Sequence, residues 1–341
     1  MELDPSTVLD RIPVLPGIYS VDVFGGFLHE LRDSLSTPGS QPHIHLFAYD
    51  WRDDYLVAVK KLARLITELT NKDAVSISIV AHSMGGLITS YYLRYGHQEP
   101  EQAVETWEGA AQIDKVVLAT VPFKGSMTAL RNMKHGAKFG LNTTLVKAQA
   151  FATFPSVYEM MPTYAPVLLD GELKPLSHTL FESDLWQQYG WGFWDNAIHA
   201  TSVSEQTRQR RLAFVTAALR RGRRLYERMH SPLQRAPRLH TQMLYTFAAS
   251  HATIARAVLI NAEAAPTLIF HRDEFTKHFP TKRYRTLFED GDETVSVPSA
   301  QLPSAFKQAL AGLTEYQSQA GHAQIFNDRE IRGHIFDFLN S

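Results

Sequence analysis

One serine of the 341-residue sequence stands in a setting that would make its hydroxyl a nucleophile. Ser83 lies in the segment Val80–Gly86, between a β-rich run and an amphipathic stretch. A nucleophile on a sharp strand-to-helix turn needs small residues two positions before and after it, and Ala81 and Gly85 meet that need. The turn would also aim the Met84 amide at the same space, where it can bind an oxyanion. An ordinary turn with a surface serine is the alternative, and the flanking strand and helix patterns argue against it.

A serine hydroxyl is a weak nucleophile at neutral pH, so it requires a base, and the base requires an orienting carboxylate. Chains with this kind of turn carry the three groups in the order serine, acid, histidine. Asp292 lies far downstream of Ser83, in a predicted turn, and His322 lies further on, before the last predicted helix. We predict Asp292 as the orienting acid and His322 as the base, with Asp290 and His334 as rivals. A solvated acidic turn and a surface histidine are the alternatives for the two positions.

Strand and helix patterns alternate around these residues. Strands are predicted over 43–48, 75–80, 115–119, 242–248 and 267–271. Helices are predicted from Tyr55 with Asp53 or Asp54 as N-cap, from Ser83 to about Tyr95, and at the end with Ile331, Ile335 and Phe338 on one face. Such alternation over short links indicates a parallel sheet with helices on both faces. From about 126 to 238 the sequence is mostly helical, with no obvious strand, so we expect one α/β domain with a long helical insertion.

Five segments resemble the lecithin:cholesterol acyltransferase family. They are Phe47–Arg52, Ala81–Gly86, Ala119–Ser126, Phe154–Pro162 and Gly291–Val295, in the family's order. The family is a branch of the α/β-hydrolases that includes lysosomal phospholipase A2 and phospholipid:diacylglycerol acyltransferases. The resemblance implies an α/β-hydrolase fold as a single domain over 1–341, with a helical cap over 126–238.

The same resemblance implies the triad Ser83, Asp292 and His322. Glu293 stands where the family usually has Gly, and residues 165–285 match only loosely. We therefore expect a serine acyl hydrolase or O-acyltransferase that acts on a lipid ester, phospholipid or acylglycerol, through an acyl-enzyme and without a cofactor. A short-chain carboxylesterase and a catalytically dead lipid-binding relative are the alternatives. The acyl acceptor, the acyl chain length and the oligomeric state stay open.

Further residues were weighed as parts of the site. We predict Trp51 and Phe123 as substrate contacts, although Phe123 fits a packing role equally well. His43 and His45 would share one strand face as a metal pair, but no third ligand is in reach by sequence, so we expect no metal. Asp50 and Arg52 are expected to form a structural ion pair that fixes their loop.

The stretch Arg208–Arg228 carries eight arginines, and its Leu212, Val215, Leu219 and Tyr226 lie on one helix face. A cap helix with a solvated basic face is the first interpretation. Transient contact with an anionic lipid surface is the alternative.

Composition limits the function further. The formal net charge of -1 argues against a nucleic-acid partner bound by bulk charge, and the absence of cysteine excludes a cysteine nucleophile. The chain starts with acidic residues and no apolar run, so we expect no secretory signal and, by default, a cytoplasmic protein.

An oxyanion hole needs a second amide besides that of Met84. The candidates are the amides of Gly17 to Tyr19, with Ile18 at the centre, after a short strand that contains Pro13. We expect that the chain lacks the usual first strands and starts late. The alternative is a compact variant in which the Pro16–Ser20 loop supplies the donor.

Overall fold

The computed structural model describes residues 11–15, 19–22, 24–37, 42–71, 76–139, 142–196, 198–199, 202–235, 237–261, 266–310 and 312–341. The chain forms two units. The first comprises Met1–Val121, Arg228–His251 and Leu302–Ser341, and the second comprises Pro122–Glu227 and Ala252–Gln301. The predicted division into one domain with a cap at 126–238 stays a prediction.

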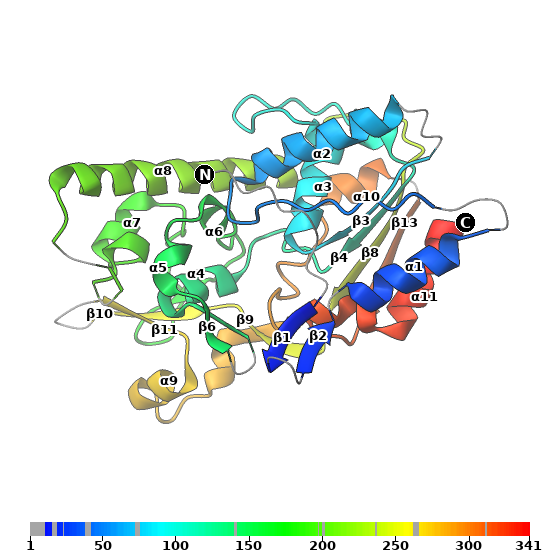
Figure 1. Ribbon diagram of the computed structural model, residues 1–341. Coiled ribbons are helices and arrows are strands. Elements are labelled where there is room, and N and C mark those ends of the chain that lie inside the picture. The colour runs from blue at the N-terminus through cyan, green and yellow to red at the C-terminus, as the bar shows by residue number, and fades with distance from the viewer. Residues whose placement is uncertain are drawn as a thin grey trace. The chain divides into compact units, whose positions relative to one another are not determined.

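A parallel sheet of four strands lies at the centre of the first unit, in the order β13-β8-β4-β3 (Figure 1). Its strands are β3 (Ser78–His82), β4 (Lys115–Ala119), β8 (Gln242–Ala248) and β13 (Gly312–Ser318). In the register of the sheet Val80 pairs with Val117, and Val117 pairs with Leu244. The apolar run of β4 is completely buried from its second residue on, as expected for an inner strand of a sheet covered on both faces.

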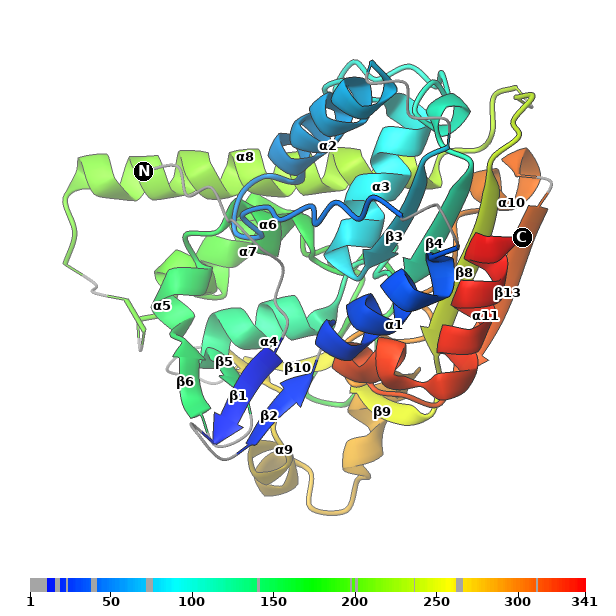
Figure 2. The same cartoon turned by 45° about the vertical axis from the view of Figure 1, so that its right-hand side comes forward.

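Helices cover both faces of this sheet, as the alternating pattern predicted. Figures 1 and 2 show α1 (Gly25–Leu35) and α11 (Arg329–Asn340) side by side on one face, and α2 (Tyr55–Thr70) and α3 (Met84–Tyr95) on the other. Phe27, Ile331 and Ile335 fill the layer beneath α1 and α11. Asp54 caps α2 by accepting the Leu56 amide at 2.7 Å, which confirms one of the two predicted caps.

One sequence prediction for this unit was wrong, and one strand was missed. Residues 43–48 form no strand, because β-rich composition makes a strand only where a neighbouring strand supplies ladder partners. The sequence also did not reveal β13, which contains mostly exposed positions and therefore lacks the apolar run of a buried strand. The remaining elements of this unit are the antiparallel hairpin β1 (Arg11–Leu15) and β2 (Tyr19–Asp22), and the short helices η1 (Ala110–Gln112), α10 (Ser304–Ala309) and η4 (His322–Asn327).

The second unit is mixed rather than purely helical. Its helices are α4 (Met127–His135), α5 (Ala148–Phe151), α6 (Pro155–Glu159), α7 (Ser183–Gln188), η2 (Gly192–Trp194), α8 (Glu205–His230, ending in the first unit), α9 (Arg272–His278) and η3 (Tyr284–Leu287). Its strands are β5 (Ala137–Phe139), β6 (Asn142–Val146), β7 (Leu168–Leu169), β9 (His251–Ile254), β10 (Ala257–Asn261), β11 (Pro266–Ile269) and β12 (Phe288–Gly291). The short strands β5, β6 and β7 lie within 126–238, so the prediction of a stretch without strands was wrong. Strands of two to five residues are too short to give a clear periodicity signal.

The core of the second unit is rich in aromatic side chains. Tyr158 and Trp186 are completely buried in it, with ring centroids 5.0 Å apart, and the Trp186 indole donates to the Leu180 carbonyl at 2.8 Å. The inner face of α8 completes this core through Val215 and Leu219. Within the described ranges, no helix combines the length and apolar composition that a bilayer span requires.

A buried arginine links α3 to the last turn of α8 and to the residues that follow it. Arg94 has no exposed side-chain surface and pairs with Glu105, of which 3% is exposed. Its guanidinium also donates to the carbonyls of Arg228, Met229, Ser231 and Pro232, at 2.9 to 3.2 Å. Burial raises the pKa of Glu105, but the bonds from Arg94 outweigh this effect and leave the pKa lowered. The helix that starts at Ser83 is therefore held at its far end by a fully paired buried charge.

We predict that Arg94→Met lowers the free energy of unfolding by about 3–5 kcal/mol, because Glu105 and the carbonyls stay buried without their donor. Urea unfolding measures the change. Arg223→Gln is the matched control: this exposed arginine pairs with Glu227 at the i,i+4 spacing, and its loss is expected to change stability by about 0.5 kcal/mol or less. Equal stability of the two variants would contradict the prediction.

Candidate active site

Ser83 occupies a strained backbone conformation between β3 and α3. Its φ of 53° and ψ of −125° lie in a region that residues with a side chain seldom adopt. The Ser83 amide still donates to the Ala119 carbonyl at 2.9 Å, so the ladder of the sheet continues to this residue. The helix then begins at Met84 without a connecting loop. The turn predicted from the sequence is thus present, with Ser83 at its apex and at the carboxyl end of a parallel strand.

The closest packing at this turn lies at Gly86. A Cβ atom there would come within 2.2 Å of a Val121 methyl carbon, and Val121 is completely buried. At Gly85 a Cβ atom would meet Ala81 at 4.0 Å and the Tyr49 hydroxyl at 3.6 Å, which are ordinary contacts. Small residues were predicted to be necessary at positions 81 and 85, whereas the structure has no room for a methyl group at Gly86.

His322 reaches Ser83 from the opposite edge of the sheet. It follows β13, which is separated from β3 by three strand spacings of about 4.8 Å each, or about 14 Å. The Ser250 hydroxyl and the His251 ring both bond to the Gln319 carbonyl and hold the connecting chain. The His322 Nε2 atom lies 2.9 Å from the Ser83 Oγ atom.

This pair has the geometry that proton transfer requires. A base within about 2.6–3.2 Å of a hydroxyl can take its proton as the oxygen attacks an electrophile. Ser83 and His322 are both half-buried. The Met84 amide is the first of α3, one of the helix amides without an acceptor in the helix, and the helix dipole adds positive potential there.

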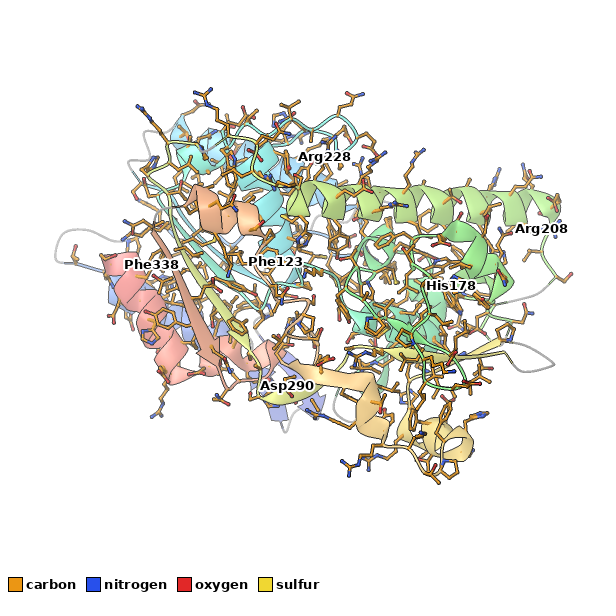
Figure 3. All side chains as sticks on the ribbon, turned by 180° about the vertical axis from the view of Figure 1, so that it is seen from behind. Phe123, His178, Arg208, Arg228, Asp290 and Phe338 are labelled. Carbon is orange, nitrogen blue, oxygen red and sulfur yellow. The ribbon has the colours of Figure 1, made fainter. Side chains whose placement is uncertain are left out.

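Asp292 belongs to the second unit and is 1% exposed. Its Oδ1 atom accepts the amides of Thr294 at 2.9 Å and Val295 at 2.6 Å, which hold the carboxylate in one orientation. The rival Asp290 lies on the surface, where its carboxylate is 65% exposed and pairs with Arg285 at 2.7 Å (Figure 3).

The structure places the other predicted site residues as follows. Ile18 and Gly17 lie outside the described residues. Trp51 is 44% exposed in the turn before α2, and Phe123, which follows β4, is completely buried. The roles of Trp51 and Phe123 as substrate contacts stay predictions.

Arg52 donates to both carboxylate oxygens of Asp50, at 2.8 and 2.6 Å, which confirms the predicted ion pair. The Arg52 bond lowers the Asp50 pKa against the opposing effect of burial. His43 and His45 are exposed on a segment that forms no strand, so the strand face predicted for them does not exist. In the described part of the chain, no three histidine or carboxylate side chains are grouped so that they could hold a metal ion.

Sequence reasoning did not single out His82 or Tyr49. The His82 Nε2 atom lies 2.9 Å from the backbone oxygen of His322, so the residue before the serine contacts the histidine as well. Tyr49 lies beside the elbow, near Gly85, and burial raises its pKa far above the ordinary value. In the sequence, only their positions could have pointed to them: His82 directly precedes Ser83, and Tyr49 lies in the segment Phe47–Arg52, which resembles the family.

A parallel sheet covered by helices, with a serine on a strand-to-helix elbow and a histidine delivered after the last strand, defines an α/β-hydrolase. The family model of lecithin:cholesterol acyltransferase matches residues 14–326, and the chain belongs to this family. Membership supports an enzyme that acts on lipid esters as a hydrolase or acyltransferase. Among solved structures, one titled "The crystal structure of Tle4-Tli4 complex" aligns with a TM-score of 0.56 at 13% identity, over 93% of this chain and 78% of the other. That likeness shows the fold alone, and no curated protein matches the chain.

We predict that Gly86→Ala lowers the free energy of unfolding by about 1–3 kcal/mol, because the new methyl group and the buried Val121 cannot both keep their places. Gly85→Ala is the matched control in the same helix turn. Its methyl group meets only ordinary contacts and removes a helical glycine, so stability is expected to stay equal or to rise by up to about 1 kcal/mol. Thermal or urea unfolding separates the two, and a larger loss for Gly85→Ala would contradict the prediction.

Proposed function

We propose that this protein is a serine acyl hydrolase or O-acyltransferase whose substrate is a lipid ester, phospholipid or acylglycerol. The observation that carries the proposal is the 2.9 Å bond between His322 Nε2 and the Ser83 hydroxyl on a strained elbow. Backbone strain of this kind costs on the order of 1–3 kcal/mol and persists where the surrounding structure enforces it. At the end of a sheet strand, this strained conformation presents the Ser83 hydroxyl to His322, the proposed base.

In the proposed mechanism His322 takes the proton of Ser83 as the serine oxygen attacks the ester carbonyl. The Met84 amide donates to the oxyanion of the tetrahedral intermediate. Protonated His322 then gives its proton to the departing alkoxide, which leaves an acyl group on Ser83. Water or a lipid hydroxyl, deprotonated by His322, then attacks this acyl-enzyme. The bond between the acyl group and Ser83 breaks, His322 returns the proton to the serine oxygen, and free acid or a new ester is released.

We propose Asp292 as the carboxylate that orients His322. Its support is burial together with two accepted amide bonds, whereas the rival Asp290 is exposed and already paired with Arg285. For the second oxyanion donor we propose an amide between Gly17 and Tyr19, as the sequence suggests. A lipid ester is favoured over a small soluble ester by the family.

We predict that Ser83→Ala and His322→Ala each lower kcat for ester hydrolysis by about 10⁴-fold, because members of a triad act as a unit. The double variant is expected to lose little more than either single one. Ser90→Ala is the matched control: Ser90 is fully buried in the same helix and its Oγ atom makes no hydrogen bond in the described structure. Activity is measured with a chain-length series of esters, with and without an alcohol acceptor.

Labelling with a fluorophosphonate probe distinguishes the alternatives. A lipase of the proposed kind is labelled at Ser83 and prefers long acyl chains, and a short-chain carboxylesterase is labelled but prefers short ones. A catalytically dead lipid-binding relative is not labelled. Full activity of Ser83→Ala would contradict the proposed function outright.

The proposed lipid substrate gives the basic face of α8 a partner, an anionic lipid surface. The helix carries eight arginines and two glutamates, while the whole chain has a net charge of -1. Its inner face is buried in the core, whereas Arg208, Arg210, Arg220, Arg223 and Arg224 are exposed (Figure 3 marks Arg208 and Arg228 toward its two ends). Glu205 pairs with Arg208, and Glu227 pairs with Arg223 and Arg224.

We predict that Arg220, Arg223 and Arg224, changed together to Gln, weaken binding to vesicles with anionic lipid by about 10- to 100-fold, since each such charge contributes up to about 1 kcal/mol near an anionic surface. Arg221 is left unchanged because it is half-buried. Glu227→Gln should strengthen binding, and salt should weaken it in the wild type. Co-sedimentation with anionic and neutral vesicles measures the effect. Hydrolysis of a soluble ester by the triple variant is expected to stay unchanged. Equal binding of the wild type to both kinds of vesicle would leave α8 with its packing role alone.

A further inference from the structure

Two consecutive residues of the elbow contact the same histidine at two different atoms. The Ser83 hydroxyl lies 2.9 Å from the Nε2 atom of His322, and the Nε2 atom of His82 lies 2.9 Å from its backbone oxygen. The histidine is therefore held both at its ring and at its main chain.

The direction of the second bond is fixed by chemistry. A carbonyl oxygen only accepts, so the His82 Nε2 atom must carry the proton and donate it. The His82 ring packs between aromatic side chains, with ring centroids 5.7 Å from Phe24 and 5.8 Å from Phe326. These contacts restrict the rotation of the ring and keep its Nε2–H group directed at the carbonyl.

His322 needs such support because of the way it is delivered. It follows a chain segment that crosses from the far edge of the sheet, and it is the first residue of the short helix η4. A shift of about 1 Å between reacting groups can lower a rate by about 10²-fold. The bond from His82 acts on the backbone of His322 itself. It fixes that backbone relative to the end of β3, the strand that directly precedes Ser83.

We propose that His82 is a positioning residue, whose Nε2–H group holds the His322 main chain so that its ring stays within reach of the Ser83 hydroxyl. The role rests on the proposed function of Ser83 and His322. It differs from packing, since a leucine side chain can fill the space beside Phe24 and Phe326 but cannot donate a hydrogen bond. The donor, rather than the volume of the side chain, is what the reaction requires.

Three variants at this position separate the donor from the volume. His82→Leu removes the donor and is expected to lower kcat by about 10- to 100-fold with KM within twofold of the wild type. His82→Gln places an amide N–H group near the former Nε2 position and is expected to restore most of the rate. His82→Asn is the matched control, because its amide has one bond less of reach and should stay as slow as His82→Leu. Urea midpoints and the rate of fluorophosphonate labelling are measured for all three.

Equal kcat for His82→Leu and the wild type, or equal rates for the Gln and Asn variants, would overturn the proposal. A second readout does not depend on activity. Nitrogen NMR of labelled histidine should show the His82 Nε2 atom protonated in the wild type and in Ser83→Ala. The His82 and His322 ring centroids lie 4.8 Å apart, so loss of the His82 ring shifts the His322 ring signals in every variant, and a larger shift in His82→Leu than in His82→Gln reports the lost donor. If the wild type has no esterase activity, the proposed function fails, whereas a His82 Nε2 atom without a proton refutes the positioning role by itself.

Discussion

The conformation of Ser83 is the constraint on which the site depends. A positive φ at a residue with a side chain is unfavourable, so neighbouring structure must enforce it. The Ser83 amide bonds to the end of β4, and the first turn of α3 packs at Gly86 against Val121, directly after that strand. Arg94 then fixes the other end of α3 in the buried interior. Ser83 is thus held by a backbone hydrogen bond to the sheet, by the packing of Gly86 in the helix that follows it, and by the buried ion pair of Arg94 at the end of that helix.

The second requirement is a path that brings His322 to Ser83. β3 and β13 lie at opposite edges of the sheet, so sheet pairing alone cannot bring their successors together. The chain after β13 is held at Gln319 by residues that follow β8, and at His322 by His82 and Ser83. Each successive bond shortens the free length of chain before the bonded pair Ser83 and His322. These successive hydrogen bonds explain how the segment after β13 brings His322 to a fixed position beside Ser83.

The elbow, the flanking helices and the two inner strands could be predicted because each leaves a local signal of spacing, capping or apolar composition. β13 could not, since its side chains are mostly exposed and only its backbone pairs with β8. Residues 43–48 have the composition of a strand without the pairing, which composition does not encode. The burial that distinguishes Asp292 from Asp290 and the contact between His82 and His322 could not be predicted either, because both depend on residues distant in the sequence.

The turn at Asp292 shows how a departure from the family pattern can be accommodated. Glu293 stands where the family usually has Gly, and its φ of 80° lies in the region that favours glycine. The Glu293 amide donates to the Thr253 hydroxyl at 2.8 Å, and the next two amides donate to the Asp292 carboxylate. Since its side chain is exposed, Glu293 meets no steric obstacle beyond its own backbone. Three amide bonds therefore preserve the glycine-like conformation around Asp292 although the glycine itself is absent.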